Sequence, residues 1–120
     1  MARVIGPDFV ALQVRDLDAS KQFYTEWLGL EVDPNGPPGA VVFRTEPVPF
    51  AVREPLVDLD AVDRLGWGIA LWMKCDSSDE LCRSLSSGGI EIAQEPFDSP
   101  FGRTFAFVDP DGYTVTVHDG

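Results

Sequence analysis

Apolar and polar positions along the chain form a pattern that occurs twice. The apolar run 10–16 ends in polar residues, and so does the run 69–75. After each run, apolar side chains recur four positions apart, which places them on one face of a helix. These side chains are Ala19, Phe23 and Trp27 in the first half, and Leu81 and Leu85 in the second. Each half therefore predicts a strand followed by a helix.

Signals for the ends of the two helices also repeat. Asp18 is expected to cap the start of the first helix, and Ser77 with Glu80 three residues later forms a capping box for the second. Gly29 and the pair 88–89 are expected to end the helices, because a left-handed C-cap favours glycine. The repeat spans about half the chain, which favours internal duplication.

Three further strands are predicted after each helix. They cover 30–32, 40–44 and 49–53 in the first half, and 90–92, 103–108 and 113–118 in the second. The turn Asp109-Pro110-Asp111-Gly112 joins the last two strands as a hairpin. We therefore expect an α+β domain over residues 1–120, built of two βαβββ modules at 1–55 and 68–120. Residues 56–67 form an acidic connection between them.

Charge and hydropathy exclude several classes of partner. The 120 residues include 9 basic and 20 acidic side chains, which give a net charge of −11. Nucleic acids and anionic membranes need a basic surface, so neither is expected to bind. The chain has no apolar run of about 20 residues and no apolar stretch at its start, so we expect a cytoplasmic protein. Cys75 and Cys82 are expected to stay reduced.

The two ends of the chain resemble a known superfamily. The run 12–20, with Phe23-Tyr24 and Leu28-Gly29-Leu30 after it, resembles the opening of a vicinal oxygen chelate module. Phe101-Gly102-Arg103 and the run 107–113 resemble its close. The superfamily includes glyoxalase I, extradiol dioxygenases, fosfomycin resistance enzymes and bleomycin resistance proteins. The resemblance implies curved mixed sheets around a cleft, in which the enzymes hold a divalent metal.

The resemblance also implies where the metal ligands should stand. These positions fall on Phe9, Gly68, Thr116 and about Ala51. Phenylalanine, glycine and alanine have no side-chain donor for a metal, and threonine is a poor one. The only histidine, His118, does not make a metal site by itself. We therefore expect no metal and no other cofactor.

A cleft without a metal would present flat and small side chains with a few polar groups. Strand alternation directs the side chains of every second residue into the cleft. The aromatic residues at strand ends and in loops are expected to form the rim of the cleft. Arg103 either binds a ligand carboxylate or pairs with an acidic side chain of the protein. The candidate ligand-binding residues are Phe9, Ala11, Gln13, Phe50, Arg53, Trp67, Trp72, Phe101, Arg103, Thr116 and His118. An alternative for Phe9 and Trp72 is that their side chains fill the cleft as part of the hydrophobic core.

Two functions of different classes remain open. The first is metal-independent binding of a small aromatic or cationic molecule, similar to the sequestration performed by bleomycin resistance proteins. A net charge of −11 would attract a cation. The alternative is an enzyme of the superfamily, a lyase, isomerase or dioxygenase with an atypical or absent metal site. For an enzyme that works without a metal, His118 and Glu54 are the candidates for moving protons. The resemblance also implies a homodimer.

Overall fold

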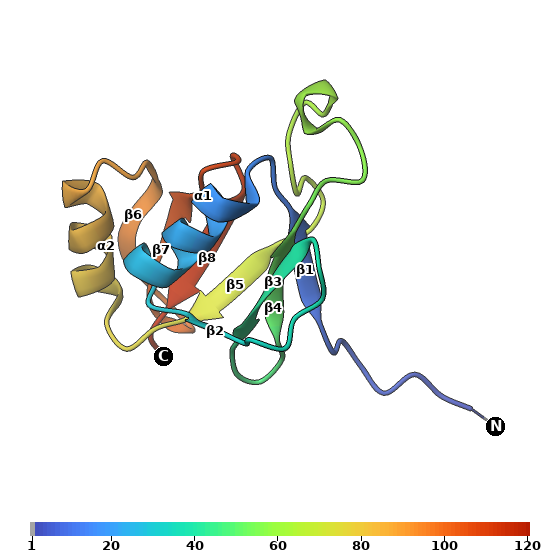
Figure 1. Cartoon of the computed structure of the whole chain (residues 1–120). Coiled ribbons are helices and arrows are strands. Elements are labelled where there is room, and N and C mark those ends of the chain that lie inside the picture. Colours follow the sequence, from blue (N-terminus) through green and yellow to red (C-terminus); the bar gives the residue numbers. More distant parts are fainter. Residues whose placement is uncertain (1) are drawn as a thin grey trace. The chain divides into compact units, whose positions relative to one another are not determined.

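The computed structural model describes residues 2–120, which divide into two units, residues 2–61 and residues 62–120. The first unit contains one four-stranded sheet in the order β1-β4-β3-β2 (Figure 1). Strand β1 runs parallel to β4, and the other neighbours are antiparallel. Its elements are β1 (Val10–Gln13), α1 (Leu17–Gln22), the π-helical turn η1 (Phe23–Trp27), β2 (Glu31–Val32), β3 (Ala40–Arg44), β4 (Phe50–Arg53) and the 3-10 turn η2 (Leu59–Ala61).

The second unit repeats this topology with the sheet order β5-β8-β7-β6 (Figure 1). Strand β5 runs parallel to β8, and β7 is antiparallel to both of its neighbours. Its elements are β5 (Leu71–Lys74), α2 (Ser78–Ser87), β6 (Ile92–Ser99), β7 (Gly102–Val108) and β8 (Thr114–His118). The prediction of two βαβββ modules is therefore confirmed. The division between the units falls inside the acidic connection.

The core of the first unit is a cluster of aromatic rings between the helix and the sheet. Tyr24 lies 5.1 Å from Phe23 and 5.1 Å from Phe50 between ring centroids, and Phe43 stacks on Phe50 at 5.9 Å. Phe50 is only 4% exposed. The expectation that Phe50 lies at a ligand rim is corrected, because the alternation of β4 turns this ring toward the helix.

The start of the first helix differs from the prediction. The carboxylate of Asp16, not that of Asp18, accepts a hydrogen bond from Ala19 N at 3.1 Å. Asp18 lies inside the first turn, where a negative charge is also favourable. In the second unit Ser77 caps the helix as predicted, and its Oγ accepts from Glu80 N at 3.3 Å.

The helical segment of the first unit is one residue longer than that of the second. It runs from the cap Asp16 to Gly29, against Ser77 to Gly89 in the second unit. A π-helical turn at Phe23–Trp27 absorbs the extra residue. This turn breaks the spacing of four that placed Trp27 on the same helix face as Phe23, and Trp27 is 36% exposed whereas Phe23 is buried.

The core of the second unit is formed by alternate residues of its central strands. Phe105 and Phe107 of β7 and Val115 and Val117 of β8 are buried, together with Leu85 of α2. Strand β5 begins at Leu71, two residues later than predicted, because Gly66–Gly68 form a turn closed by Ile69 N and Gly66 O at 3.1 Å. None of the helices formed by residues 2–120 has the length and apolar character needed to cross a bilayer.

Candidate functional site

The strand register of the second unit defines a sheet face that points away from its helix. Trp72 pairs with Thr116, and Lys74 pairs with His118. Paired residues share a face, and successive residues alternate between faces. Since Val115 and Val117 are buried in the core, Trp72, Lys74, Thr116 and His118 lie on the opposite side. We call this side the open face of the second unit.

Three predicted site residues come together on this open face. The ring of Trp72 lies 5.5 Å from that of Phe101 and 6.0 Å from that of His118, between centroids. Phe101 and His118 are 6.5 Å apart. Trp72 is 45% exposed and Phe101 is 58% exposed. These three residues, here called the aromatic cluster, therefore keep much of their ring surface accessible within the unit.

The β6–β7 hairpin places Phe101 beside the strands. Gly102 has φ +99°, and a Cβ there would lie 2.5 Å from Gly120 N, so only glycine fits without a shift. The hydroxyl of Ser99 accepts from Phe101 N at 3.0 Å and lies 2.7 Å from Thr104 Oγ1. The Phe-Gly-Arg sequence thus serves first to shape a tight turn that carries an aromatic ring.

His118 is oriented by a hydrogen bond to the backbone of this turn. Its Nδ1 lies 3.1 Å from the carbonyl oxygen of Phe101. A carbonyl oxygen only accepts, so Nδ1 must carry the hydrogen, and in the neutral ring Nε2 keeps its lone pair. The imidazole therefore offers an acceptor beside the ring of Trp72.

In the first unit, the predicted polar residues bind backbone groups. Ala11 pairs with Ala51, and Gln13 pairs with Arg53, on the side of the sheet away from the aromatic core. Gln13 Oε1 accepts from Leu56 N at 2.7 Å, and Arg53 Nε donates to Glu54 O at 3.2 Å. These contacts hold the chain that leaves β4. Phe9 precedes β1 and is 50% exposed.

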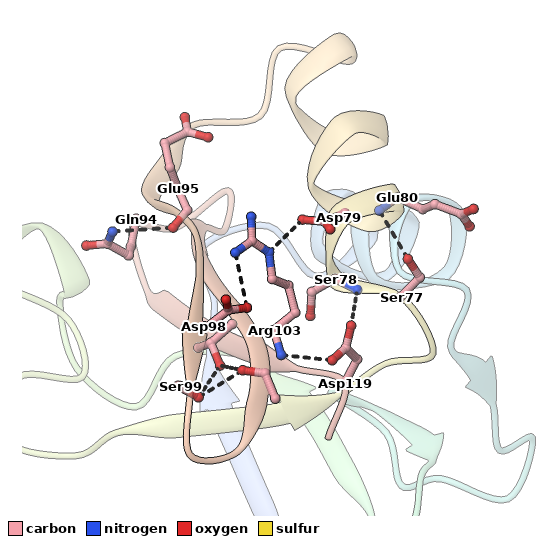
Figure 2. A network of polar contacts seen from close by, with 12 residues as sticks. Ser77, Ser78, Asp79, Glu80, Gln94, Glu95, Asp98, Ser99, Arg103 and Asp119 are labelled. Carbon is pink, nitrogen blue, oxygen red and sulfur yellow. Dashed lines mark hydrogen bonds and ion pairs between the residues drawn. The ribbon is translucent and has the colours of Figure 1, made fainter.

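Arg103 lies on the helix side of the second sheet, so its placement among cleft residues is corrected. Its Nε donates to Asp79 at 3.1 Å and its Nη1 to Asp98 at 3.3 Å (Figure 2). The hydrogen bond to Asp79 raises the pKa of Arg103. Trp67, another candidate, is 74% exposed, with the guanidinium of Arg64 4.0 Å from its ring centroid.

A hollow of about 490 Å³ lies beside Arg103, between α2 and β6. Its lining is Asp79, Cys82, Arg83, Ser86, Ser87, Glu95, Pro96 and Arg103. Most of these residues are charged or polar, and Arg103 already pairs with protein carboxylates. The open face offers exposed rings for a flat molecule, and we therefore take it as the better candidate site.

Sequence reasoning missed two residues that shape this region. Asp119 accepts from Ser78 N at 3.1 Å and from Arg103 N at 2.9 Å, which ties the end of β8 to α2 and β7 (Figure 2). These two hydrogen bonds lower the pKa of Asp119, and the bond from Ser78 has the larger effect. Lys74 joins the open face through its pairing with His118. The strand alternation that placed Trp72 on the open face also places Lys74 there, so this signal was present in the sequence and was not used. The sequence pattern gave no signal for Asp119.

The side chains present do not fit a metal centre of the kind the superfamily's enzymes use. Among residues 2–120, no three His, Cys, Asp or Glu side chains lie together in a way that could hold an ion. Thr116 and Ala51 occupy corresponding places on β8 and β4, and neither is a good donor. Burial raises the pKa of the Cys75 and Cys82 thiols, which disfavours the thiolate form that binds metals.

The repeated βαβββ topology defines a protein built of two related sheet modules. Residues 6–117 match the Glyoxalase/Bleomycin resistance protein/Dioxygenase superfamily. The chain therefore belongs to this superfamily, also called the vicinal oxygen chelate superfamily, as its sequence motifs indicated. No curated protein matches the chain in sequence.

Several solved structures share this fold. Lactoylglutathione lyase from Agrobacterium tumefaciens is 22% identical, with 99% of this chain and 96% of that chain covered and a TM-score of 0.70. The fosfomycin resistance protein FosX from Listeria monocytogenes is 19% identical, with 98% and 95% covered and a TM-score of 0.74. UcmS2 is 26% identical, with 100% and 99% covered and a TM-score of 0.72. At these identities the first two matches establish the fold alone.

Proposed function

We propose that the protein binds a small, planar aromatic molecule on the open face of its second unit, without a metal ion. The observation that carries this proposal is the aromatic cluster of Trp72, Phe101 and His118, with two of its rings 45% and 58% exposed. Binding without conversion suits a protein that sequesters a molecule, because sequestration needs no catalytic group.

The chemistry of the cluster supports stacking with orientation by a few polar groups. An aromatic pair contributes about 0.5–1.5 kcal/mol beyond the burial of its area. Nε2 of His118 and the hydroxyl of Thr116, which pairs with Trp72, provide hydrogen-bonding groups on the same face. Ligand sites commonly combine apolar walls with a small number of polar groups in this way.

A ligand-observed NMR titration with the neutral probe 2-naphthamide tests the proposal. We expect Trp72→Ala to weaken binding about tenfold or more, since the loss of stacking and of buried ring area exceeds about 1.4 kcal/mol. Trp27→Phe, on the first unit and 36% exposed, is the matched control and should bind as the parent protein does. Equal affinity of the parent and Trp72→Ala would refute the proposed site.

We also propose that the protein forms a homodimer. The support is the superfamily resemblance, together with large apolar side chains that stay exposed within the second unit. Trp67 is 74% and Ile69 83% exposed, and such groups often mark contact surfaces. Light scattering after size exclusion should give twice the chain mass of 13.2 kDa. A mass of one chain at all concentrations would contradict this proposal.

A further inference from the structure

We propose that Lys74 makes the open face of the second unit selective for aromatic molecules that carry an anionic group, such as an aryl carboxylate. This inference rests on the proposed function and goes beyond it by naming the charge of the ligand. It also reverses the expectation of a cationic ligand, which came from the net charge of the whole chain.

The position of Lys74 carries the inference. Lys74 pairs with His118 and lies two residues after Trp72 on β5, so its side chain shares their face. The residue is exposed, and it forms none of the ion pairs found among residues 2–120. An accessible ammonium group therefore stands next to the aromatic cluster.

No carboxylate competes for Lys74 from the open face itself. By register, the described strand residues on this face of the sheet are Trp72, Lys74, Gln94, Phe97, Ser99, Gly102, Thr104, Ala106, Val108, Thr114, Thr116 and His118. Lys74 is the only formally charged one among them. Asp119 and Asp98 turn to the helix side, where they bind Ser78 and Arg103 (Figure 2). Asp76 lies beyond the end of β5 and is therefore not one of the strand residues on this face.

The charge next to the ligand matters more than the charge of the whole chain. Salt at physiological strength screens exposed charges beyond about 8 Å, so remote acids act weakly on a molecule at the open face. Residues two apart on a strand are roughly 7 Å apart. This spacing suits a bicyclic ring on Trp72 whose carboxylate reaches the ammonium of Lys74, while His118 Nε2 accepts from any donor on the ring.

Three probes of one shape separate charge from stacking. Dissociation constants for 2-naphthoate, 2-naphthamide and 2-naphthylmethylammonium are measured at pH 7 by NMR titration, in low and high salt. We expect naphthoate to bind about three- to fivefold more tightly than naphthamide, as an exposed ion pair allows. The cation should bind most weakly. High salt should remove most of these differences.

Variants assign the selectivity to one side chain. Lys74→Gln should weaken naphthoate to the level of naphthamide and leave naphthamide unchanged, and Lys74→Glu should make the cation the tightest of the three. Lys21→Gln, which removes the same charge from α1 of the first unit, is the matched control and should change nothing.

The outcomes distinguish this inference from the proposed function. Tighter binding of the cation than of naphthoate, or unchanged selectivity in Lys74→Gln, would overturn the role of Lys74 and leave the aromatic site intact. Failure of all three probes to bind would overturn the aromatic site and the role of Lys74 together.

Discussion

The two units share a backbone and differ in what their sheets display. In the first, Val14 N donates to Arg53 O at 2.9 Å, and in the second, Cys75 N donates to His118 O at 2.9 Å. These matching bonds set equivalent positions on the outer and central strands. The equivalent pairs away from the helices are Ala11 and Trp72, Gln13 and Lys74, Ala51 and Thr116, and Arg53 and His118.

The difference shows which positions the fold constrains. Most helix-facing strand positions of both units are apolar, since each unit buries a core of its own, and the ion pair of Arg103 with Asp98 is an exception. The opposite positions follow no common chemistry: small or backbone-bound residues in the first unit, and exposed rings with a lysine in the second. The fold constrains only the alternation of side chains at these positions, not their chemistry. The residues that point away from the helices are therefore free to differ between the units and to bind a ligand.

The largest expected effect comes from the two cores. Phe43→Ala in the first unit and Phe105→Ala in the second each remove a fully buried ring, and each should cost about 3–5 kcal/mol of unfolding free energy. Urea denaturation measures the loss. Phe101→Ala, which truncates a ring that is 58% exposed, is the control and should cost much less. Equal losses for Phe101 and Phe105 would mean that Phe101 is a core residue.

A smaller effect separates two glycines with positive φ. Gly102→Ala should destabilise by about 2 kcal/mol, because the new Cβ meets the backbone of Gly120 as well as an unfavourable φ of +99°. Gly29→Ala in the first unit has φ +73° but nothing within 4 Å, and about 1 kcal/mol is expected. Thermal denaturation compares the two variants. A greater loss at Gly29 would contradict the close approach at Gly102.

The turns and helix ends show how much of the fold could be predicted from the sequence. Short-range signals were sufficient where one residue determines the local backbone: Asp109 accepts from the backbone N–H groups of Asp111, Gly112 and Tyr113, as its turn sequence indicated. The same holds for Ser77 as an N-cap. Helix spacing failed at Trp27, because a single additional residue produced a π turn that a spacing of four does not reveal.

The candidate site was predictable in part for a similar reason. Alternation assigned Trp72, Thr116 and His118 to one face, and the register agrees. The same alternation places Arg103 on the helix side, where its guanidinium pairs with Asp79 and Asp98, so the second of the two expectations for Arg103 holds. Phe50 was placed from its position near a strand end, but its side chain packs on Tyr24, a contact between distant segments.

The helix caps test the corrected start of the first helix. Asp16→Ala and Ser77→Ala should each cost about 1 kcal/mol, since each removes the side-chain acceptor for an N-terminal backbone N–H. Asp18→Ala should cost only about 0.3 kcal/mol, as expected for a charge near a helix N-terminus. Guanidinium denaturation provides the comparison. A larger loss at Asp18 than at Asp16 would restore Asp18 as the cap.

The smallest expected effect concerns the ends of the two sheets. Asp119 follows β8 and binds backbone N–H groups of Ser78 and Arg103, whereas Glu54, which follows β4 in the first unit, makes no side-chain hydrogen bond found among residues 2–120. Because folding lowers the pKa of Asp119, its carboxylate stabilises the folded state above the unfolded pKa of about 3.9. This contribution is lost as the pH falls through the lower pKa that Asp119 has in the folded state.

Asp119→Asn should therefore lower the urea midpoint at pH 7, and the difference from the parent protein should shrink as the pH falls below about 4. Glu54→Gln, the matched change in the first unit, should show no such pH-dependent difference. Midpoints measured from pH 2 to 7 provide the test. A constant deficit for Asp119→Asn across this range would mean that the ionised carboxylate does not hold α2 to the end of β8.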